Sequence, residues 1–285
     1  MEKNYNTIVI SGGALKGFAI LGCLQLLVDQ QKLQSINKYI ATSIGAIISY
    51  LIIIGYSPIE IMVNLCKNDW LDEMAKFDIL KAINGCGAIS FSLITDILEK
   101  MTIEKIGRLI TIGELYTEFH KELYCCTYNF SKKCHEFINP HDNKNIPCLI
   151  ALRMTSNLPI LFEPFLYESS YYIDGALLYN FPVFYVDLDK DKAIGIKFKT
   201  HTGGTTNFTG KNFFNFLYEL LIIPSLSLEE FMNKDHVEKV DIIEIDLSGI
   251  QCLNFNISKS DRLEFFSNGY ETAYKFFHNV NIHNE

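Results

Sequence analysis

The feature that most constrains this chain is a serine placed between two apolar runs. Tyr39–Thr42 has the composition of a short buried strand, and residues 47–54 form an apolar run suited to a helix. Between them lie Ser43 and, two residues later, Gly45. This order predicts a nucleophile elbow, a sharp turn that lifts a serine side chain out of the sheet where a helix begins. Ala41 and Gly45 are small enough for the close approach of strand and helix, and the helix N-terminus favours developing negative charge.

The elbow pattern alone leaves two interpretations open. The usual pattern is G-x-S-x-G, and here Ala41 stands at the first glycine position. A serine between a strand and a helix is also a common N-cap, whose side chain bonds the first helical N–H groups. Ser43 is therefore predicted to be either a nucleophile or a cap, and other parts of the chain must decide.

A glycine-rich turn lies upstream of the serine. The run Thr7–Ile10 predicts a buried strand, the sequence Ser-Gly-Gly-Ala-Leu-Lys-Gly follows at 11–17, and a helical apolar period comes next. Such turns present backbone N–H groups to an anion, but the glycine spacing fits neither the dinucleotide fingerprint nor the Walker pattern. An oxyanion hole suits the turn best because a serine elbow follows one helix later. A phosphate loop of another type, or a plain tight turn, remains open.

Composition narrows the function classes. The formal net charge of −8 argues against nucleic acid as a partner, because such binders need a basic surface. The eight cysteines show no metal-ligand spacing, so we expect no metal site. The N-terminus has no signal-peptide pattern, and the apolar run Ile44–Tyr56 is shorter than the roughly 18–20 residues of a spanning helix. We therefore expect a cytoplasmic protein with no transmembrane helix.

Strand and helix patterns alternate along the chain. This alternation predicts a single α/β domain over residues 1–285, with a three-layer α/β/α architecture and a mostly parallel central sheet. Residues 68–113 are less regular and are expected to form an inserted lid or acyl pocket. Further strands are predicted at Glu122–Asn129, Cys134–Ile138, Tyr171–Ala176, Ala193–Lys199 and Asp241–Leu247, and further helices at residues 58–66, Pro147–Ser156, Phe213–Ile223 and Ser258–His278.

Three motifs in the correct order resemble the patatin-like phospholipase family. They are the glycine-rich turn at residues 11–17, the elbow at residues 41–46 and the sequence Asp174-Gly175-Ala176. The segments at residues 151–159 and 174–183 also resemble that family, and the similarity extends from about residue 8 to residue 183. The chain departs from the family at Ala14 and Ala41, where glycine is usual. Ala14 can still donate its N–H, provided that the loop does not need a positive φ there.

The resemblance implies a Ser-Asp dyad and no cofactor. Ser43 is then the nucleophile, Asp174 the general base, and the N–H groups of Gly12, Gly13 and Ala14 form the oxyanion hole. Lys16 and Gly17 support that loop, and Lys16 has a second candidate role, the attraction of a phosphate head group. The implied activity is that of a phospholipase A-type lipid acyl hydrolase, which forms an acyl-enzyme from a phospholipid or another acyl-ester lipid and contacts membranes peripherally.

Two alternatives and one further expectation accompany this interpretation. His201 could complete a Ser-His-Asp triad, although it lies in a polar loop. The chain could also be a lipid-binding or effector module that has lost turnover, which the alanines at 14 and 41 motivate. In the catalytic interpretation, aromatic side chains of residues 68–113, such as Trp70 and Phe91, and of Phe213–Ile223 line an acyl groove and a membrane-facing rim.

Overall fold

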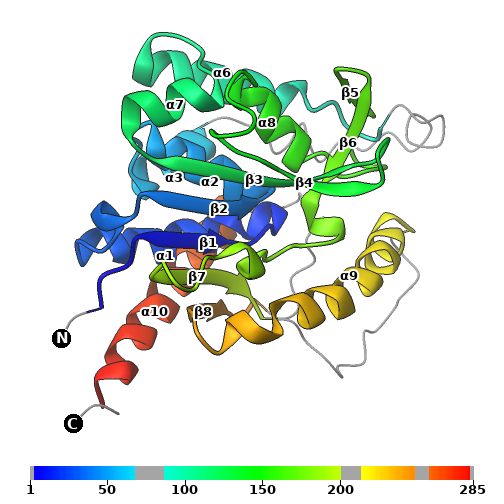
Figure 1. Ribbon diagram of the computed structural model, residues 1–285. Coiled ribbons are helices and arrows are strands. Elements are labelled where there is room, and N and C mark those ends of the chain that lie inside the picture. The colour runs from blue at the N-terminus through cyan, green and yellow to red at the C-terminus, as the bar shows by residue number, and fades with distance from the viewer. Residues whose placement is uncertain (1–2, 68–86, 200–212, 248–256, 283–285) are drawn as a thin grey trace.

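A mixed eight-stranded sheet forms the centre of the protein (Figure 1). The computed structural model describes residues 3–67, 87–199, 213–247 and 257–282. The strands are β1 Thr7–Ile10, β2 Lys38–Thr42, β3 Glu122–Asn129, β4 Cys134–Ile138, β5 Phe165–Tyr167, β6 Ser170–Asp174, β7 Ala193–Phe198 and β8 Asp241–Ile245. Their order is β5-β6-β3-β2-β1-β7-β8, and β4 also pairs with β3.

The middle of the sheet is parallel. Strands β3, β2, β1, β7 and β8 pair in parallel, whereas β4 and β6 pair with β3 in the antiparallel sense, as β5 does with β6. The carboxyl ends of β1 and β2 lie side by side, with Ile10 opposite Ala41. The turns that follow these two strands therefore meet at one edge, which is where open α/β sheets place their ligand sites.

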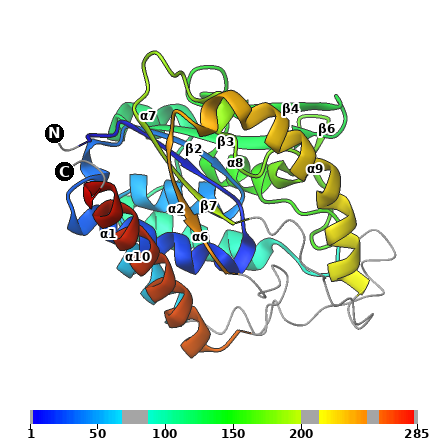
Figure 2. The same ribbon diagram turned by 90° about the horizontal axis from the view of Figure 1, so that it is seen from below.

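Helices lie on both faces of the sheet, which confirms the predicted α/β class. They are α1 Gly17–Asp29, α2 Ile44–Ile53, α3 Pro58–Lys67, α6 Ser92–Ile106, α7 Ile112–Phe119, α8 Cys148–Thr155, α9 Phe213–Val237 and α10 Lys259–Ile282. Figure 2 shows α1 and α10 together on one face, with α9 on the opposite side of the strands. Short 3₁₀ turns at Gly175–Leu177 and Val183–Tyr185 pack against α9, and the first of them also contacts β3.

The central strands are apolar on both faces because both faces are covered. In β1, Ile8 and Ile10 join the large core beneath α1, α2 and α10, whereas Val9 joins a smaller core on the opposite face. Neighbouring strands alternate in the same way, with Ile40 of β2 beside Val9. A continuous β-branched run is the expected pattern for such a strand.

Helix α1 is buried around most of its circumference because α10 packs against its outer side. A Cβ on Gly22 would lie 2.0 Å from the carbonyl oxygen of Phe266, and one on Gly269 would lie 1.9 Å from that of Ala19. The Cys23 thiol also donates to the Gly269 carbonyl over 3.0 Å. The two helix backbones thus touch directly, and both glycines are needed for that contact.

Several elements differ from the sequence prediction. The helix predicted to end at Ile223 continues through Pro224 to Val237. Phe91, expected to line a groove, is 2 % exposed and packs edge-on against Phe162, 4.9 Å between ring centroids. Trp70 and the side chains of residues 213–219 lie outside the described part of the chain.

None of the described helices is both long enough and apolar enough to cross a membrane alone. Among the described helices, only α2 and α3 taken as a pair are long and apolar enough to span a membrane. The chain bends by 117° at the break between them.

Candidate active site

Ser43 occupies the sharp turn between β2 and α2. Its backbone has φ 54° and ψ −126°, a conformation that a residue with a Cβ rarely adopts. Gly45 makes the turn possible, because a Cβ there would lie 2.6 Å from the carbonyl oxygen of Ser11. Ala41 lies inside β2 without a positive φ, so the first glycine of the usual elbow pattern is not needed here.

The Ser43 side chain points to Asp174 and does not cap its own helix. Its hydroxyl donates to Oδ2 of Asp174 over 2.7 Å, and the two residues are 131 positions apart in sequence. No hydrogen bond joins the Ser43 side chain to the first N–H groups of α2. The N-cap interpretation of Ser43 is therefore wrong, and the serine has a carboxylate as its partner.

Asp174 ends β6 and lies fully inside the protein. Its Oδ1 accepts a hydrogen bond of 2.8 Å from the N–H of Ala176. Gly175 follows at a position where a Cβ would lie 2.3 Å from the Cys126 carbonyl, so the turn fits against β3 only with glycine. Burial raises the pKa of the Asp174 carboxyl to about 7, although the hydrogen bonds from Ala176 and Ser43 act in the opposite direction.

Thr155 holds the strained serine from the side of α8. The N–H of Ser43 donates to Oγ1 of Thr155 over 3.0 Å, and that hydroxyl in turn donates to the carbonyl of Cys126. Thr155 is fully buried. Thr155 lies in the segment 151–159 that resembles the family, but the sequence alone assigned this residue no role.

The glycine-rich loop lies beside the serine, with one change to the expected set of donors. A Cβ on Gly12 would lie 3.2 Å from that of Ser43, so the loop and the elbow are in contact. The N–H of Gly12, however, donates to the carbonyl of Asn180 over 3.2 Å and is not free for an oxyanion. Including Gly12 as a donor was therefore wrong for this conformation. Among the described residues, the N–H groups of Gly13 and Ala14 have no protein acceptor.

The backbone conformation of Ala14 also matters, because its expected role as a donor depended on the absence of a positive φ there. Its φ is 46°, so the loop does require a positive φ at this position, where an alanine is strained. Gly13 faces the ring of Phe198, which a Cβ would overlap at 2.3 Å.

Lys16 and Gly17 support the loop in different ways. The Lys16 ammonium lies 5.7 Å from the centroid of the Phe198 ring, a cation–π contact across the loop. A Cβ on Gly17 would lie 2.6 Å from Ile44 Cγ1, so this glycine lets the start of α1 approach the start of α2. The supporting contacts of both residues are thus with neighbours of the loop and the elbow.

No histidine in the described part of the chain hydrogen-bonds to Ser43 or Asp174, and both oxygens of the aspartate already have partners. His201, the candidate for a triad, lies outside the described residues. Within the described ranges, no group of three or more His, Cys, Asp or Glu side chains is arranged to hold a metal ion.

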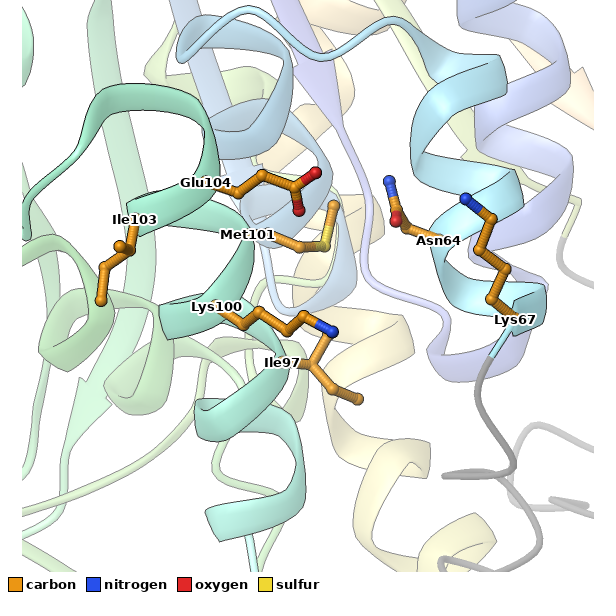
Figure 3. Close-up of a pocket in the computed structure, with 7 residues that line it drawn as sticks. All are labelled: Asn64, Lys67, Ile97, Lys100, Met101, Ile103 and Glu104. Atoms are coloured by element: carbon orange, nitrogen blue, oxygen red, sulfur yellow. The ribbon is translucent and has the colours of Figure 1, made fainter.

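A separate cleft lies between α3 and α6 (Figure 3). Its volume is about 610 Å³, and its lining includes neither Ser43, Asp174 nor a residue of the glycine-rich loop. The lining residues are Asn64, Lys67, Ile97, Lys100, Met101, Ile103 and Glu104. The cleft shares no residue with the Ser43–Asp174 pair, but five of its lining residues belong to the predicted insertion at residues 68–113.

Solved structures with the same fold include VipD and ExoU. VipD from Legionella pneumophila superposes with a TM-score of 0.59 at 14 % identity, over 97 % of this chain and 67 % of that one. The type III effector ExoU gives a TM-score of 0.55 at 13 % identity, over 97 % of this chain and 53 % of that one. At these identities the likeness shows the fold alone.

Two viral proteins are related in sequence. "Probable lipid hydrolase 463L" of Invertebrate iridescent virus 6 is 34 % identical over 187 residues, which are 64 % of this chain and 63 % of the relative. "Uncharacterized protein R571" of Acanthamoeba polyphaga mimivirus is 24 % identical over 282 residues, 95 % of this chain and 93 % of that protein. The family model of the patatin-like phospholipases matches residues 8–187, a range that holds the glycine-rich loop, Ser43 and Asp174. The chain belongs to the patatin-like phospholipase family.

Proposed function

We propose that this protein is a serine lipid acyl hydrolase of the phospholipase A type, which cleaves carboxylic ester bonds of phospholipids with Ser43 as nucleophile and Asp174 as general base. The observation that carries the proposal is the 2.7 Å hydrogen bond between the Ser43 hydroxyl and the buried Asp174 carboxylate. A carboxylate with its pKa near 7 is a competent base at neutral pH, unlike one with the ordinary value near 4.

The reaction runs in two halves. Ser43 Oγ attacks the ester carbonyl carbon while Asp174 takes the hydroxyl proton. The N–H groups of Gly13 and Ala14 bind the oxyanion of the tetrahedral intermediate, and losing one such donor typically costs about 100–1000-fold in kcat. Asp174 then gives its proton to the departing alcohol oxygen of the lysolipid, which leaves an acyl ester on Ser43. Water attacks that ester with Asp174 again as base; Asp174 then returns the proton to Ser43 Oγ as the bond to the acyl carbon breaks, and the fatty acid leaves.

Helix α9 is proposed as the lipid-facing rim. Leu220 is 46 % exposed, Ile223 57 % and Phe231 76 %. Ile223 and Phe231 follow Leu220 by three and eleven residues, which places the three side chains on one helical face. Burying such a face yields roughly 25 cal/mol per Å² of apolar surface, so peripheral docking to a membrane does not require basic residues. A lid or acyl pocket within residues 68–113 remains part of the proposal, without the buried Phe91.

The test is hydrolysis of a defined phosphatidylcholine, with the products identified by mass. The wild type should release a fatty acid and a lysolipid, Ser43→Ala should release neither, and the exposed-site control Ser267→Ala should match the wild type. A fluorophosphonate probe should label the wild type and Ser267→Ala, but not Ser43→Ala. Wild-type protein that neither labels nor hydrolyses would contradict the proposal.

The second candidate, a lipid-binding module without turnover, is favoured by one observation. The Gly12 N–H is engaged by Asn180, so the hole has fewer free donors than expected. This candidate predicts vesicle binding without release of fatty acid. The same assay run beside a vesicle co-sedimentation experiment distinguishes the two.

A further inference from the structure

The inner face of α9 is joined to the segment that follows Asp174. Oε2 of Glu229 accepts a hydrogen bond of 3.0 Å from the N–H of Phe181. The side-chain amide of Asn233 donates to the carbonyl of Phe181 over 2.8 Å, and its oxygen accepts from the N–H of Phe184 over 3.2 Å. Both backbone polar groups of Phe181, a residue that is 1 % exposed, are thus satisfied by side chains of one distant helix.

The same segment is joined to the site on its other side. The carbonyl of Asn180, next to Phe181, accepts the N–H of Gly12 in the glycine-rich loop. The carbonyl of Tyr179 accepts the hydroxyl of Thr42 over 3.0 Å, and Thr42 precedes Ser43. Residues 179–181 therefore connect α9 to both the loop and the elbow, and the position of Gly12 depends on where Asn180 is held.

We propose that Glu229 is a positioning residue for ester hydrolysis, whose carboxylate fixes the backbone at Asn180 and Phe181 on α9 and through the Asn180 carbonyl sets the Gly12–Ala14 loop against Ser43. This inference rests on the proposed function. Glu229 does not touch the reacting atoms, so its effect is expected in kcat, through the geometry of the oxyanion donors, and not in substrate affinity.

The surroundings of Glu229 indicate that it accepts hydrogen bonds at an energetic cost. Burial raises the pKa of Glu229 to about 7, against the effects of the Phe181 and Asn180 N–H groups and of Lys197. The Lys197 ammonium is itself paired with Glu244 of β8 at 2.8 Å. The salt bridges among the described residues do not include Glu229, and its partly buried carboxylate instead accepts hydrogen bonds from backbone N–H groups.

The experiment compares four variants on a soluble short-chain ester. Glu229→Ala removes the carboxylate acceptor, and Glu229→Asp shortens the side chain by one methylene. Glu229→Gln keeps an acceptor oxygen without the charge. Glu230→Ala is the matched control, because Glu230 is the next residue and its side chain is exposed. We expect Glu229→Ala and Glu229→Asp to lower kcat at least ten-fold with KM within three-fold. Glu229→Gln and Glu230→Ala should stay within three-fold of the wild type.

A second readout does not depend on activity. Amide hydrogen exchange should accelerate at least ten-fold at Phe181 and Gly12 in Glu229→Ala, and not in Glu230→Ala. If the wild type hydrolyses no ester, the proposed function fails while this measurement still decides the positioning role. Unchanged exchange at both amides in Glu229→Ala, or wild-type kcat in an active Glu229→Ala protein, would overturn the inference.

Discussion

The backbone N–H of Ser43 donates to the hydroxyl of Thr155, at 3.0 Å, in a buried contact between the elbow and α8. The serine backbone lies in a sparsely populated region, and such conformations cost on the order of 1–3 kcal/mol unless the surroundings hold them. Thr155 supplies that support because its hydroxyl both accepts from the strained residue and donates to β3.

Two substitutions of Thr155 should therefore separate the effect of its side-chain volume from the effect of its hydrogen bonds. Thr155→Val preserves the volume but leaves the Ser43 N–H without its acceptor, which should lower stability by about 1–3 kcal/mol and kcat at least ten-fold. Thr155→Ser keeps the hydroxyl and should retain kcat within three-fold. Urea unfolding and ester kinetics measure both effects, and equal kinetics for the two variants would show that Thr155 contributes packing only.

The pH dependence of activity should follow Asp174. Its pKa lies at about 7, and only the ionised form accepts the serine proton. Because protonation removes the base, kcat/KM on a soluble ester should fall about ten-fold per pH unit below that value. An activity that stays level down to pH 5 would mean that Asp174 is not the titrating base.

The identity of the base can be tested against the histidines. Asp174→Ala should abolish turnover as completely as Ser43→Ala, whereas His201→Ala and His236→Ala should remain within a few-fold of the wild type. The measurement is kcat on the soluble ester, with far-ultraviolet circular dichroism to verify folding. A histidine variant that is folded yet as inactive as Ser43→Ala would establish a triad.

Asp174 should also make the protein less stable as the pH rises. Its pKa is about 7 when folded and near 4 when unfolded, so the folded state binds more protons between these values. Wild-type stability contributed by this group is therefore present below about pH 4 and lost as the pH rises through 7. Asp174→Asn, which carries no charge, should be more stable than the wild type at pH 8, by about 1–3 kcal/mol, and by less at pH 5. Denaturant titrations at the two pH values test this; a margin that is larger at pH 5 would contradict it.

The two alanines that depart from the family pattern should respond in opposite directions to glycine. Ala14 has a φ of 46°, so Ala14→Gly relieves strain and should stabilise the protein by about 0.5–1 kcal/mol. Ala41 is fully buried inside β2, so Ala41→Gly should destabilise it by about 1 kcal/mol without raising activity. Thermal unfolding of the two variants measures the pair, and a stabilising Ala41→Gly would show that the elbow is strained at that position.

The central sheet and the turns that carry Ser43 and Asp174 were predictable because they depend on local sequence patterns. The central strand β1 is a short β-branched run, since it is covered on both faces, and the sharp turn after β2 requires the small residue Gly45. The pairing of Ser43 with Asp174 came from the order of motifs. Their distance could not have come from composition, because it depends on how β6 pairs with β3.

Other features depend on tertiary contacts that leave no local signal. Pro224 predicts the end of a helix, yet α9 continues because Glu229 and Asn233 bond to the segment after Asp174. The engagement of Gly12 depends on the path of Asn180, 168 positions away in sequence. Neither contact has a motif of its own, so sequence reasoning could not anticipate the occupied donor or the longer helix.

The close backbone contacts between α1 and α10, which Gly22 and Gly269 allow, bear on where the chain can be cut. The family model ends at residue 187, before β7, β8 and α10. A fragment ending there would turn β1 into an edge strand, since β7 is its neighbour, and would leave the outer side of α1 in water. We therefore propose that the motif-bearing segment is not an independent folding unit, and that the helix which starts at the glycine-rich loop is completed by the opposite end of the polypeptide.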